Sequence, residues 1–468
     1  MQPVEILSGE ALEAIHQTSL KILAEVGVRF SHPRALELFQ KHGYQTEGEL
    51  VFFTENQVMS SLANIPFNFT LRARNGDRDV TVGAGDTVFA PGYGAPFLID
   101  PEEGKQIPTL TDYRRLLQLN QMLPNQDLTG YLLVEPQDVP PEQAHLYMLS
   151  EAHRWTDKPM LGSAENGQAA ADTLAMAKIV FGDPLEDFVT LGVISALSPL
   201  AYSPDMIEAV LAFAGNNQPM IFANLVMAGS TGPITLPGTI AQQNAELLAG
   251  IVFAQLIQPG VPVLYGTTST SIDMRTGGLT IGSPELSLIT IAHGQLARYY
   301  GLPSRGHGRR TDASTVGAQA GHESMLGMLT AIGAGMDFVL HAAGIMSSYL
   351  AFSLAKFVMD DEFCGMVRRL QGGMDVSPES LAFPVIRDVG PGGHFLNQHH
   401  TLARCRGEFV IPDIADRSGL QVWWSGPRLD AAARAAERGE ELLARYQPPA
   451  LDPLTERQLA SYVKERTA

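Results

Sequence analysis

Polar side chains follow a series of short apolar segments in the middle of the chain. The first segment leads into Pro91-Gly-Tyr-Gly-Ala-Pro-Phe97, and later ones lead into Glu165, Ser195, Asn224, Thr267-Thr-Ser-Thr-Ser271, Asp312 and His341. If the apolar segments are parallel strands of one barrel, their carboxyl ends meet on one face, where barrel enzymes place their active sites. This set is rich in hydroxyls and glycines and poor in paired acids and bases, which favours binding and orientation over proton transfer.

Aromatic residues near the same segments could hold a cationic ligand. They are Tyr93, Phe97, Tyr131, Tyr349 and Phe352. Aromatic faces attract a trimethylammonium group through cation–π interactions. We predict Tyr93, Phe97 and Phe352 as substrate contacts, with Tyr93 the best candidate because glycines flank it. Packing in the core is the alternative for each ring.

A glycine-rich segment, Gly390-Pro-Gly-Gly-His394, could bind an anion. Successive glycines let backbone N–H groups point into a concave nest, so Gly392 and Gly393 are predicted carboxylate contacts. His394 follows directly and His341 lies at a strand end, and either imidazole could donate to the same group. An ordinary tight turn is the alternative interpretation.

Arg309 and Arg310 are further candidates for carboxylate binding. A guanidinium pairs with a carboxylate through two parallel hydrogen bonds. Both arginines follow a predicted strand, beside Asp312 and with Glu323 further along the chain. A structural ion pair with one of these acids is the alternative role.

The histidines do not form a recognised metal-binding pattern. His307 and His341 have no zinc spacing, and His322-Glu323 has no second histidine where a zincin motif requires one. No Gly-x-Ser-x-Gly elbow and no phosphate-binding loop occur either. We therefore predict no metal site.

Strand and helix patterns alternate through residues 86–375, which predicts a (β/α)8 TIM barrel in this region. Several predicted strands begin with proline, which suits the first position of a strand. A doubly wound open sheet is the alternative, although no Gly-x-Gly-x-x-Gly follows the first strand. The eight predicted strands are Thr87–Ala90, Leu128–Val134, Pro159–Gly162, Phe188–Ser195, Pro219–Ala223, Pro262–Tyr265, Pro303–His307 and Phe338–His341.

The two ends of the chain have different patterns. Residues 1–85 predict an α+β extension, with helices at 8–25, 31–42 and 54–63 and two short strands after them. Residues 376–468 lack the strand–helix alternation. We expect a loop and helices there that pack on the barrel wall or on a neighbouring subunit.

Composition limits the class of protein. The chain has 468 residues, a net charge of −18 and two cysteines. The acidic balance argues against nucleic acid and anionic membranes as partners, and the few cysteines fit a reducing cytoplasm. The most apolar stretch, 328–352, carries Asp337 and His341 and is broken by glycines, so we interpret it as buried barrel rather than a membrane span.

Longer motifs extend over nearly the whole chain. They are Gly229-Ser-Thr-Gly-Pro-Ile-Thr-Leu-Pro-Gly-Thr-Ile-Ala-Gln-Gln-Asn-Ala-Glu246, Ser271-Ile-Asp-Met-Arg-Thr-Gly277, Gly282-Ser-Pro-Glu285, Gln319-Ala-Gly-His-Glu323, Asp361-Glu362, Gly390-Pro-Gly-Gly-His-Phe-Leu396 and His400-Thr401. Together and in this order, they resemble the trimethylamine methyltransferase family.

The resemblance implies a (β/α)8 barrel that moves a methyl group from an amine to the cob(I)alamin of a separate corrinoid protein. Family members that act on trimethylamine carry a pyrrolysine, and this sequence shows none. The resemblance is therefore to the branch that demethylates quaternary amines, with glycine betaine the foremost substrate and dimethylglycine the product. Cobalamin is then supplied by the partner, this chain holds no tightly bound cofactor, and a homo-oligomer is expected.

A quaternary ammonium suits a site that is poor in acids and bases. It leaves as a neutral tertiary amine, so the leaving group needs no proton. Three alternatives remain open on sequence: another quaternary amine such as carnitine or proline betaine, a metal-dependent barrel hydrolase or lyase using His307, His341 and Asp312, and a binding protein without activity.

Overall fold

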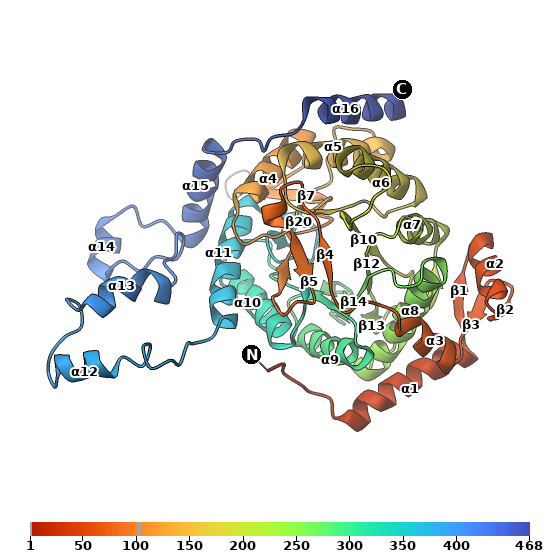
Figure 1. Cartoon of the computed structure of the whole chain (residues 1–468), viewed down its shortest axis with the longest axis horizontal. Coiled ribbons are helices and arrows are strands. Elements are labelled where there is room, and N and C mark those ends of the chain that lie inside the picture. Colours follow the sequence, from red (N-terminus) through yellow and green to blue (C-terminus); the bar gives the residue numbers. More distant parts are fainter. Residues whose placement is uncertain (1, 101–103) are drawn as a thin grey trace.

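The computed structural model of the protein describes residues 2–100 and 104–468, and its centre is one parallel sheet of seven strands. The sheet order is β6-β18-β17-β14-β12-β10-β9, so sequential strands lie side by side and the sheet curls within a ring of helices (Figure 1). That order excludes the doubly wound alternative, whose strand order reverses. The strands are β6 (Val88–Phe89), β9 (Met160–Leu161), β10 (Thr190–Ile194), β12 (Met220–Asn224), β14 (Val263–Thr267), β17 (Ser304–His307) and β18 (Phe338–Leu340).

The predicted second strand, Leu128–Val134, is wrong as a strand. The sheet is therefore a curled seven-stranded half-barrel rather than a closed eight-stranded barrel. Residues 127–134 occupy the gap between β6 and β9 with isolated contacts: Asp127 N–H donates to the Phe89 carbonyl at 2.8 Å, and Thr129 bridges Met160 in parallel. Other carbonyls of the segment accept hydrogen bonds from side chains instead of from a neighbouring strand. For example, the Asn120 amide donates to the Leu128 carbonyl at 3.0 Å.

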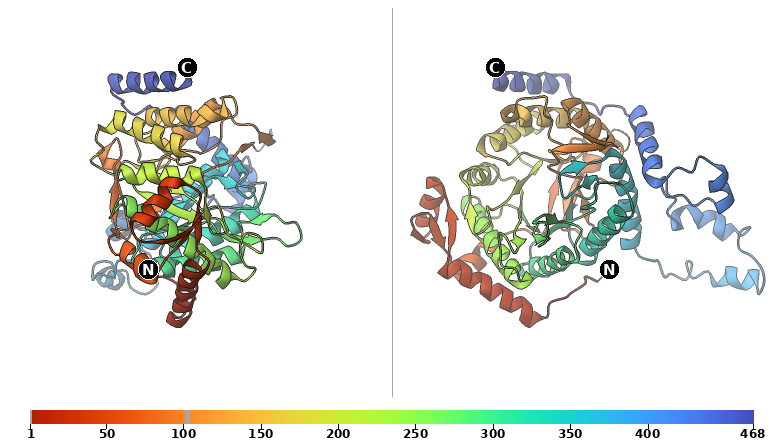
Figure 2. Two further views of the ribbon diagram at one scale, coloured as in Figure 1. Left: turned by 90° about the vertical axis from the view of Figure 1, so that its right-hand side faces the viewer. Right: turned by 180° about the vertical axis from the view of Figure 1, so that it is seen from behind.

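Eight main helices alternate with the strands and cover the outside of the sheet (Figure 2). Helix α8 is buried on all sides, because the sheet covers one face and the N-terminal helices cover the other. The eight helices are α4 (Leu110–Met122), α5 (Ala144–Trp155), α6 (Gly167–Phe181), α7 (Pro204–Gly215), α8 (Leu236–Ile257), α9 (Pro284–Tyr300), α10 (Ala318–Gly333) and α11 (Leu354–Gln371).

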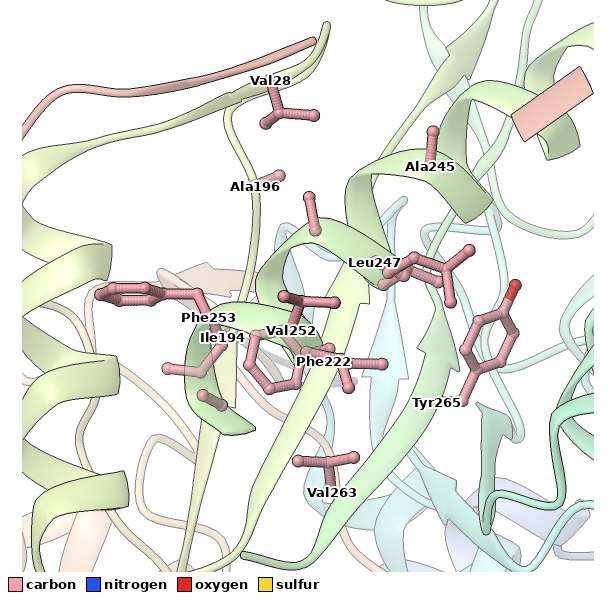
Figure 3. Packing of buried hydrophobic residues seen from close by; sticks show 14 of the residues in the cluster. Val28, Ile194, Ala196, Phe222, Ala245, Leu247, Val252, Phe253, Val263 and Tyr265 are labelled. Atoms are coloured by element: carbon pink, nitrogen blue, oxygen red, sulfur yellow. The ribbon is translucent and has the colours of Figure 1, made fainter. Parts of the chain in front are cut away.

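The largest apolar core lies between α8 and the strands beneath it. Leu247 and Val252 of α8 pack toward Phe222 of β12 and Val263 of β14 (Figure 3). Polar side chains on α8 are satisfied within this core, as when Asn244 donates to the Tyr300 hydroxyl at 2.8 Å. Burial of this apolar surface is the main force that holds the curled sheet to its helices.

The three N-terminal helices and the strands β4 and β5 lie where the patterns predict them, whereas the strands β1, β2 and β3 were not predicted. Ser8 caps the first helix by accepting a hydrogen bond from Ala11 N–H at 3.2 Å, and Thr54 and Gln57 form a capping box on the third. A small sheet joins this region to the body, because β1 pairs in parallel with β11. These elements are α1 (Gly9–Glu25), β1 (Val28–Phe30), α2 (Pro33–Lys41), β2 (Gln45–Glu47), β3 (Leu50–Phe52), α3 (Glu55–Leu62), β4 (Phe69–Leu71), β5 (Val80–Val82) and β11 (Ala201–Tyr202).

Two small sheets lie among the segments that follow the main strands. One has the order β19-β20-β7-β8 and the other β13-β15-β16. They stiffen the connections on the face where the strands end. Their bounds are β7 (Phe97–Asp100), β8 (Gly104–Gln106), β13 (Met227–Ala228), β15 (Thr270–Ile272), β16 (Leu279–Thr280), β19 (Ile345–Met346) and β20 (Ala351–Phe352).

The C-terminal part contains two helices that pack on the body and one segment that extends away from it. Helix α15 (Ala431–Ala444) packs on α11, and α16 (Pro453–Thr467) packs on α5 and α6. Residues 372–430, which we call the arm, instead project from the body (Figures 1 and 2). The arm holds α12 (Phe383–Val389), α13 (His399–Glu408) and α14 (Leu420–Ser425), and Ile414 is its one buried residue. Helices α15 and α16 thus lie on the barrel wall, whereas packing on a neighbouring subunit, the other expected arrangement, stays a prediction for the arm.

Among the helices of residues 2–100 and 104–468, none is long and apolar enough to span a bilayer. The stretch 328–352, which includes β18, is largely buried within the body.

Candidate active site

We call the segments that follow the carboxyl ends of the main strands the rim. The loop after β6 brings Tyr93 to the rim. Its glycine at position 92 is required by packing, because a Cβ there would lie 2.7 Å from the Ile345 side chain and 2.8 Å from the Phe352 ring. The loop is thus pressed onto the body, and Tyr93 stands on a fixed backbone.

His341 follows β18 with a strained backbone. Its φ is +60°, in the left-handed region that costs a non-glycine residue about 1–2 kcal/mol. The Tyr93 N–H donates to His341 Nδ1 at 3.2 Å, which requires an unprotonated Nδ1. Burial, followed by the nearby charges of Arg305 and Arg310, holds the pKa of His341 well below its usual value. The imidazole is therefore neutral and carries its proton on Nε2.

Arg310, after β17, is a buried cation that lacks a hydrogen-bonded partner. Its side chain is 1% exposed, and none of its three guanidinium nitrogens meets an acceptor among the described residues. Burial, and then Arg305, lower its pKa well below the usual value. Its guanidinium lies over the Tyr349 ring, 5.2 Å from the centroid, and the Tyr349 ring lies 5.0 Å from that of His341.

Tyr131 and Glu165 lie on the other side of Tyr93. The rings of Tyr93 and Tyr131 are 6.3 Å apart between centroids, at 56°. The Glu165 carboxylate is close enough to both phenols to raise their pKa values further, beyond the larger effect of burial. Partial desolvation by the surrounding rim raises the pKa of Glu165, and the nearby Glu135 raises it further. Part of the Glu165 residue is still exposed to solvent.

Six residues therefore form one continuous series, which we call the rim cluster. Glu165 stands at one end and Arg310 at the other, with aromatic rings and a neutral imidazole between them. Opposite charges are held apart at the two ends of an apolar series. The rim cluster consists of Tyr93, Tyr131, Glu165, Arg310, His341 and Tyr349.

Arg309, although adjacent in sequence, is used structurally. Its Nε donates to Asp360 at 2.6 Å, and its guanidinium lies 4.0 Å from the centroid of the Phe363 ring. Lys356 donates to the other oxygen of Asp360, and burial lowers the pKa of Lys356 to about 8. Arg309 therefore forms a structural ion pair, but its partner is Asp360 and not Asp312 or Glu323, the acids named from the sequence.

Phe97 and Phe352 lie outside the rim cluster. The Lys105 ammonium covers the Phe97 ring at 3.4 Å from its centroid. Phe352 is fully buried, packs on Phe357 at 5.1 Å, and supports the loop at Gly92 from beneath. Substrate contact remains an untested prediction for both rings.

Gly392, Gly393 and His394 lie on the arm, between α12 and α13. Gly392 has φ +80°, as a glycine turn requires, and the segment is exposed. Figure 1 shows α12 and α13 away from the rim of their own chain. The structure does not bring this loop together with the rim cluster.

Other polar residues at strand ends hold the backbone. Asn224 accepts from Ala196 N–H at 2.8 Å and donates to Glu246 at 3.1 Å. Asp312 accepts from the backbone of Ile281 at 2.9 Å and from the Ser348 hydroxyl at 2.6 Å. The part of the chain that the structure describes shows no group of three or more His, Cys, Asp or Glu placed to hold a metal.

The profile of the family described as trimethylamine methyltransferase (MTTB) matches residues 1–468. The chain belongs to this family. The glycine betaine methyltransferase of Desulfitobacterium hafniense (strain Y51) is 44% identical over 464 residues, which cover 98% of this chain and 97% of that protein. The proline betaine:corrinoid methyltransferase of Eubacterium limosum is 32% identical, with 98% and 97% covered.

The fold is similar to that of a methylamine methyltransferase whose structure has been solved. The monomethylamine methyltransferase of Methanosarcina barkeri superposes with a TM-score of 0.56 at 13% identity, over 96% of this chain and 90% of that one. The similarity concerns architecture alone.

For this trimethylamine methyltransferase family member, sequence reasoning selected Tyr93, His341 and Arg310 from the rim cluster and left out the rest. Tyr131 and Tyr349 were visible as aromatics near strand ends, and Glu165 as an acid after a strand. All three residues follow predicted strands, and this shared position could have indicated that they lie together at the rim. His307 was also left out, and both of its ring nitrogens are buried without a partner in the described residues.

Proposed function

We propose that this protein transfers a methyl group from glycine betaine to the cobalt of a corrinoid carried by a second protein and releases dimethylglycine. The observation that carries the proposal is the separation of charge in the rim cluster. Glycine betaine has a permanent cation at one end and a carboxylate at the other, so it matches an anionic and a cationic end in one site.

The cationic end of the substrate would lie at Tyr93, Tyr131 and Glu165. A quaternary ammonium donates no hydrogen bonds, so it is recognised by aromatic faces and by opposite charge. The Glu165 carboxylate supplies the charge, and the two phenol rings supply the apolar walls. Burial keeps both phenols neutral, because it raises their pKa values.

The carboxylate would lie at Arg310. A buried guanidinium without a protein acceptor is costly, and a bound carboxylate would remove that cost through charge-assisted hydrogen bonds. Neutral His341 can donate from Nε2 to the same carboxylate. Arg305, which is buried behind them and has a pKa lowered to about 9 by burial, adds positive potential.

Methyl transfer then needs little from the protein beyond position. The carbon–nitrogen bond breaks, its electron pair stays on nitrogen, and the methyl group goes to the corrinoid cobalt, which supplies the nucleophile. The departing tertiary amine is neutral, so no proton donor is required. The rim cluster binds the substrate, orients one methyl outward and excludes water from the ammonium.

Several parts of this proposal rest on relatives. The names of the relatives from Desulfitobacterium hafniense and Eubacterium limosum support the substrate class and the corrinoid partner as the source of cobalamin. The two free cysteines support a cytoplasmic setting. Proline betaine and carnitine carry the same two charges, so they are the alternative substrates.

Binding measurements on the purified protein test the proposal. We expect glycine betaine to raise the melting temperature, since a ligand at one hundred times its Kd adds about 2.7 kcal/mol. Choline lacks the carboxylate, so it should bind more weakly. If choline stabilised the protein as much as glycine betaine does, Arg310 would not be the carboxylate-binding residue. If no betaine stabilised the protein, the proposed function would be refuted.

A further inference from the structure

The arm carries an apolar surface that its own chain does not cover. Thirteen large apolar side chains on it are between 45% and 85% exposed, which is unusual for a monomer. They are Met374, Val376, Leu381, Phe383, Ile386, Phe395, Leu396, Leu402, Phe409, Ile411, Leu420, Val422 and Trp424. An isolated arm of this kind would leave its helices without the packing that stabilises short helices.

The arm is tied to the body near its root. Arg369 of α11 donates to the Glu408 carboxylate at 3.3 Å, and Arg434 of α15 donates to the Ile414 carbonyl at 2.8 Å. The Glu362 carboxylate accepts three backbone N–H bonds, from Asp413 at 2.5 Å, Ile414 at 2.6 Å and Ala415 at 3.0 Å. These contacts fix the root of the arm against α11. They leave the rest of the arm free to lie on another surface.

An apolar groove runs along the outer face of α10. Its volume is about 850 Å³, and its walls include Ile291 of α9, Leu326 and Leu329 of α10, and Phe363 of α11. Met325 and Leu329 are each about 40% exposed there. Val4 closes one end, where its N–H donates to the Gly333 carbonyl at 2.6 Å.

We propose that the arm of one copy lies in the α10 groove of a second copy, and that the exchange is reciprocal. Figures 1 and 2 show the arm leaving the body beside α10 and α11, and both of these helices contribute walls of the groove. When donor and acceptor surfaces share one side, a two-fold axis lets both arms dock at once and closes the assembly.

Area and charge favour this occupant. The apolar side chains of one arm expose on the order of 1,000 Å², about the total area that a specific interface needs, and two arms double it. The arm has a net charge of −2 while the rest of the chain carries −16, so the arm can approach a second acidic body with little repulsion.

A corrinoid protein is the other candidate occupant of the groove. Its cobalt has to reach the rim to receive a methyl group, whereas the groove follows the outer flank of α10 from Ala318 to Gly333 and Val4. The flank is therefore better suited to a second copy. In this arrangement the Gly390–His394 loop lies against the other copy and not against its own rim.

The mass of the purified protein in solution tests the arrangement. We expect a dimer of the 50.5 kDa chain by light scattering, or a larger assembly built from such dimers. The arm variant Leu396→Asp/Leu402→Asp and the groove variant Met325→Asp/Leu329→Asp should each lose the dimer. The control Val26→Asp changes an apolar residue outside both surfaces that is 54% exposed, between the groove and arm residues, and it should keep the dimer.

Cross-linking identifies the two partners in contact. A photoreactive phenylalanine at Leu329, in a mixture of 14N and 15N copies, should form cross-links between arm and groove that join the two isotopes. Cross-links within one copy only would mean that the arm folds back on its own chain, and this would overturn the proposal. A monomeric wild type, or arm variants that keep the wild-type mass, would also overturn it.

Discussion

Replacement of Arg310 by methionine should stabilise the protein and weaken betaine binding. The buried guanidinium meets no acceptor in the described residues, and burial lowers its pKa. It therefore costs free energy of folding at neutral pH, where it is charged. An apolar side chain of similar length removes that cost, and we expect the free energy of unfolding to rise by about 1–3 kcal/mol.

The same substitution removes the partner of the substrate carboxylate. Truncation of one member of a buried charge pair costs 2–5 kcal/mol, and about 3 kcal/mol corresponds to roughly a 150-fold rise in Kd for glycine betaine. For a chain of 468 residues, 1 kcal/mol shifts the melting temperature by about 1 °C. The variant should melt about 1–3 °C higher without ligand and gain little when betaine is added.

Arg309→Met is the matched control. Arg309 is equally buried but pairs with Asp360 at 2.6 Å, so its loss leaves Asp360 with Lys356 alone. We expect the melting temperature to fall by about 2–4 °C, as loss of one partner of a buried pair costs several kcal/mol. Calorimetric titration should show an unchanged Kd. If Arg310→Met instead melts lower and binds betaine within twofold of wild type, Arg310 is structural and the proposed carboxylate site is wrong.

Three further predictions concern the other end of the site and the arm. Glu165→Gln should raise KM for betaine about tenfold and also raise kcat, since the carboxylate stabilises the bound ammonium more than the transition state, in which that charge is disappearing. Wild-type affinity should be present above the raised pKa of Glu165 and lost as pH falls through it, and the variant should lose that dependence. Tyr93→Leu should weaken betaine binding, measured by calorimetric titration, by about 1–2 kcal/mol. Tyr131→Phe keeps its aromatic ring and should bind betaine as the wild type does. If Tyr131→Phe weakened binding and Tyr93→Leu did not, a cation–π contact at Tyr93 would be excluded. Glu362→Gln should speed amide hydrogen exchange at Ile414 and its neighbours, because the neutral amide forms weaker bonds with the three N–H groups, and unchanged exchange would show that the arm root is held elsewhere.

Sequence periodicity predicted most of the central sheet because apolar strands followed by helices leave a strong local signal. It failed at residues 128–134, where the pattern is apolar but backbone bridges are isolated, as at Thr129, and side-chain donors bind other carbonyls. The Tyr113 hydroxyl donates to the Tyr131 carbonyl at 2.5 Å, and the Asn120 amide donates to the Leu128 carbonyl at 3.0 Å. Donors that lie on other elements cannot be assigned from the segment itself.

The site was predicted in part for a similar reason. Position after a strand indicated which residues lie at the rim, and the structure places Tyr93 and His341 there. Adjacent Arg309 and Arg310 have the same local sequence context, and only the position of Asp360 on α11 separates the paired one from the unpaired one. The apolar pattern of the arm likewise showed that it must pack on something, but not on which surface.

A single-turnover methyl transfer assay tests the central claim most directly. The purified protein, reduced corrinoid protein and glycine betaine are mixed without oxygen, and dimethylglycine is measured together with the loss of the Co(I) absorbance. We predict one dimethylglycine for each Co(I) consumed, with the rate dependent on Arg310. Consumption of Co(I) by trimethylamine but not by any betaine, or no transfer from betaine despite tight binding, would contradict the account.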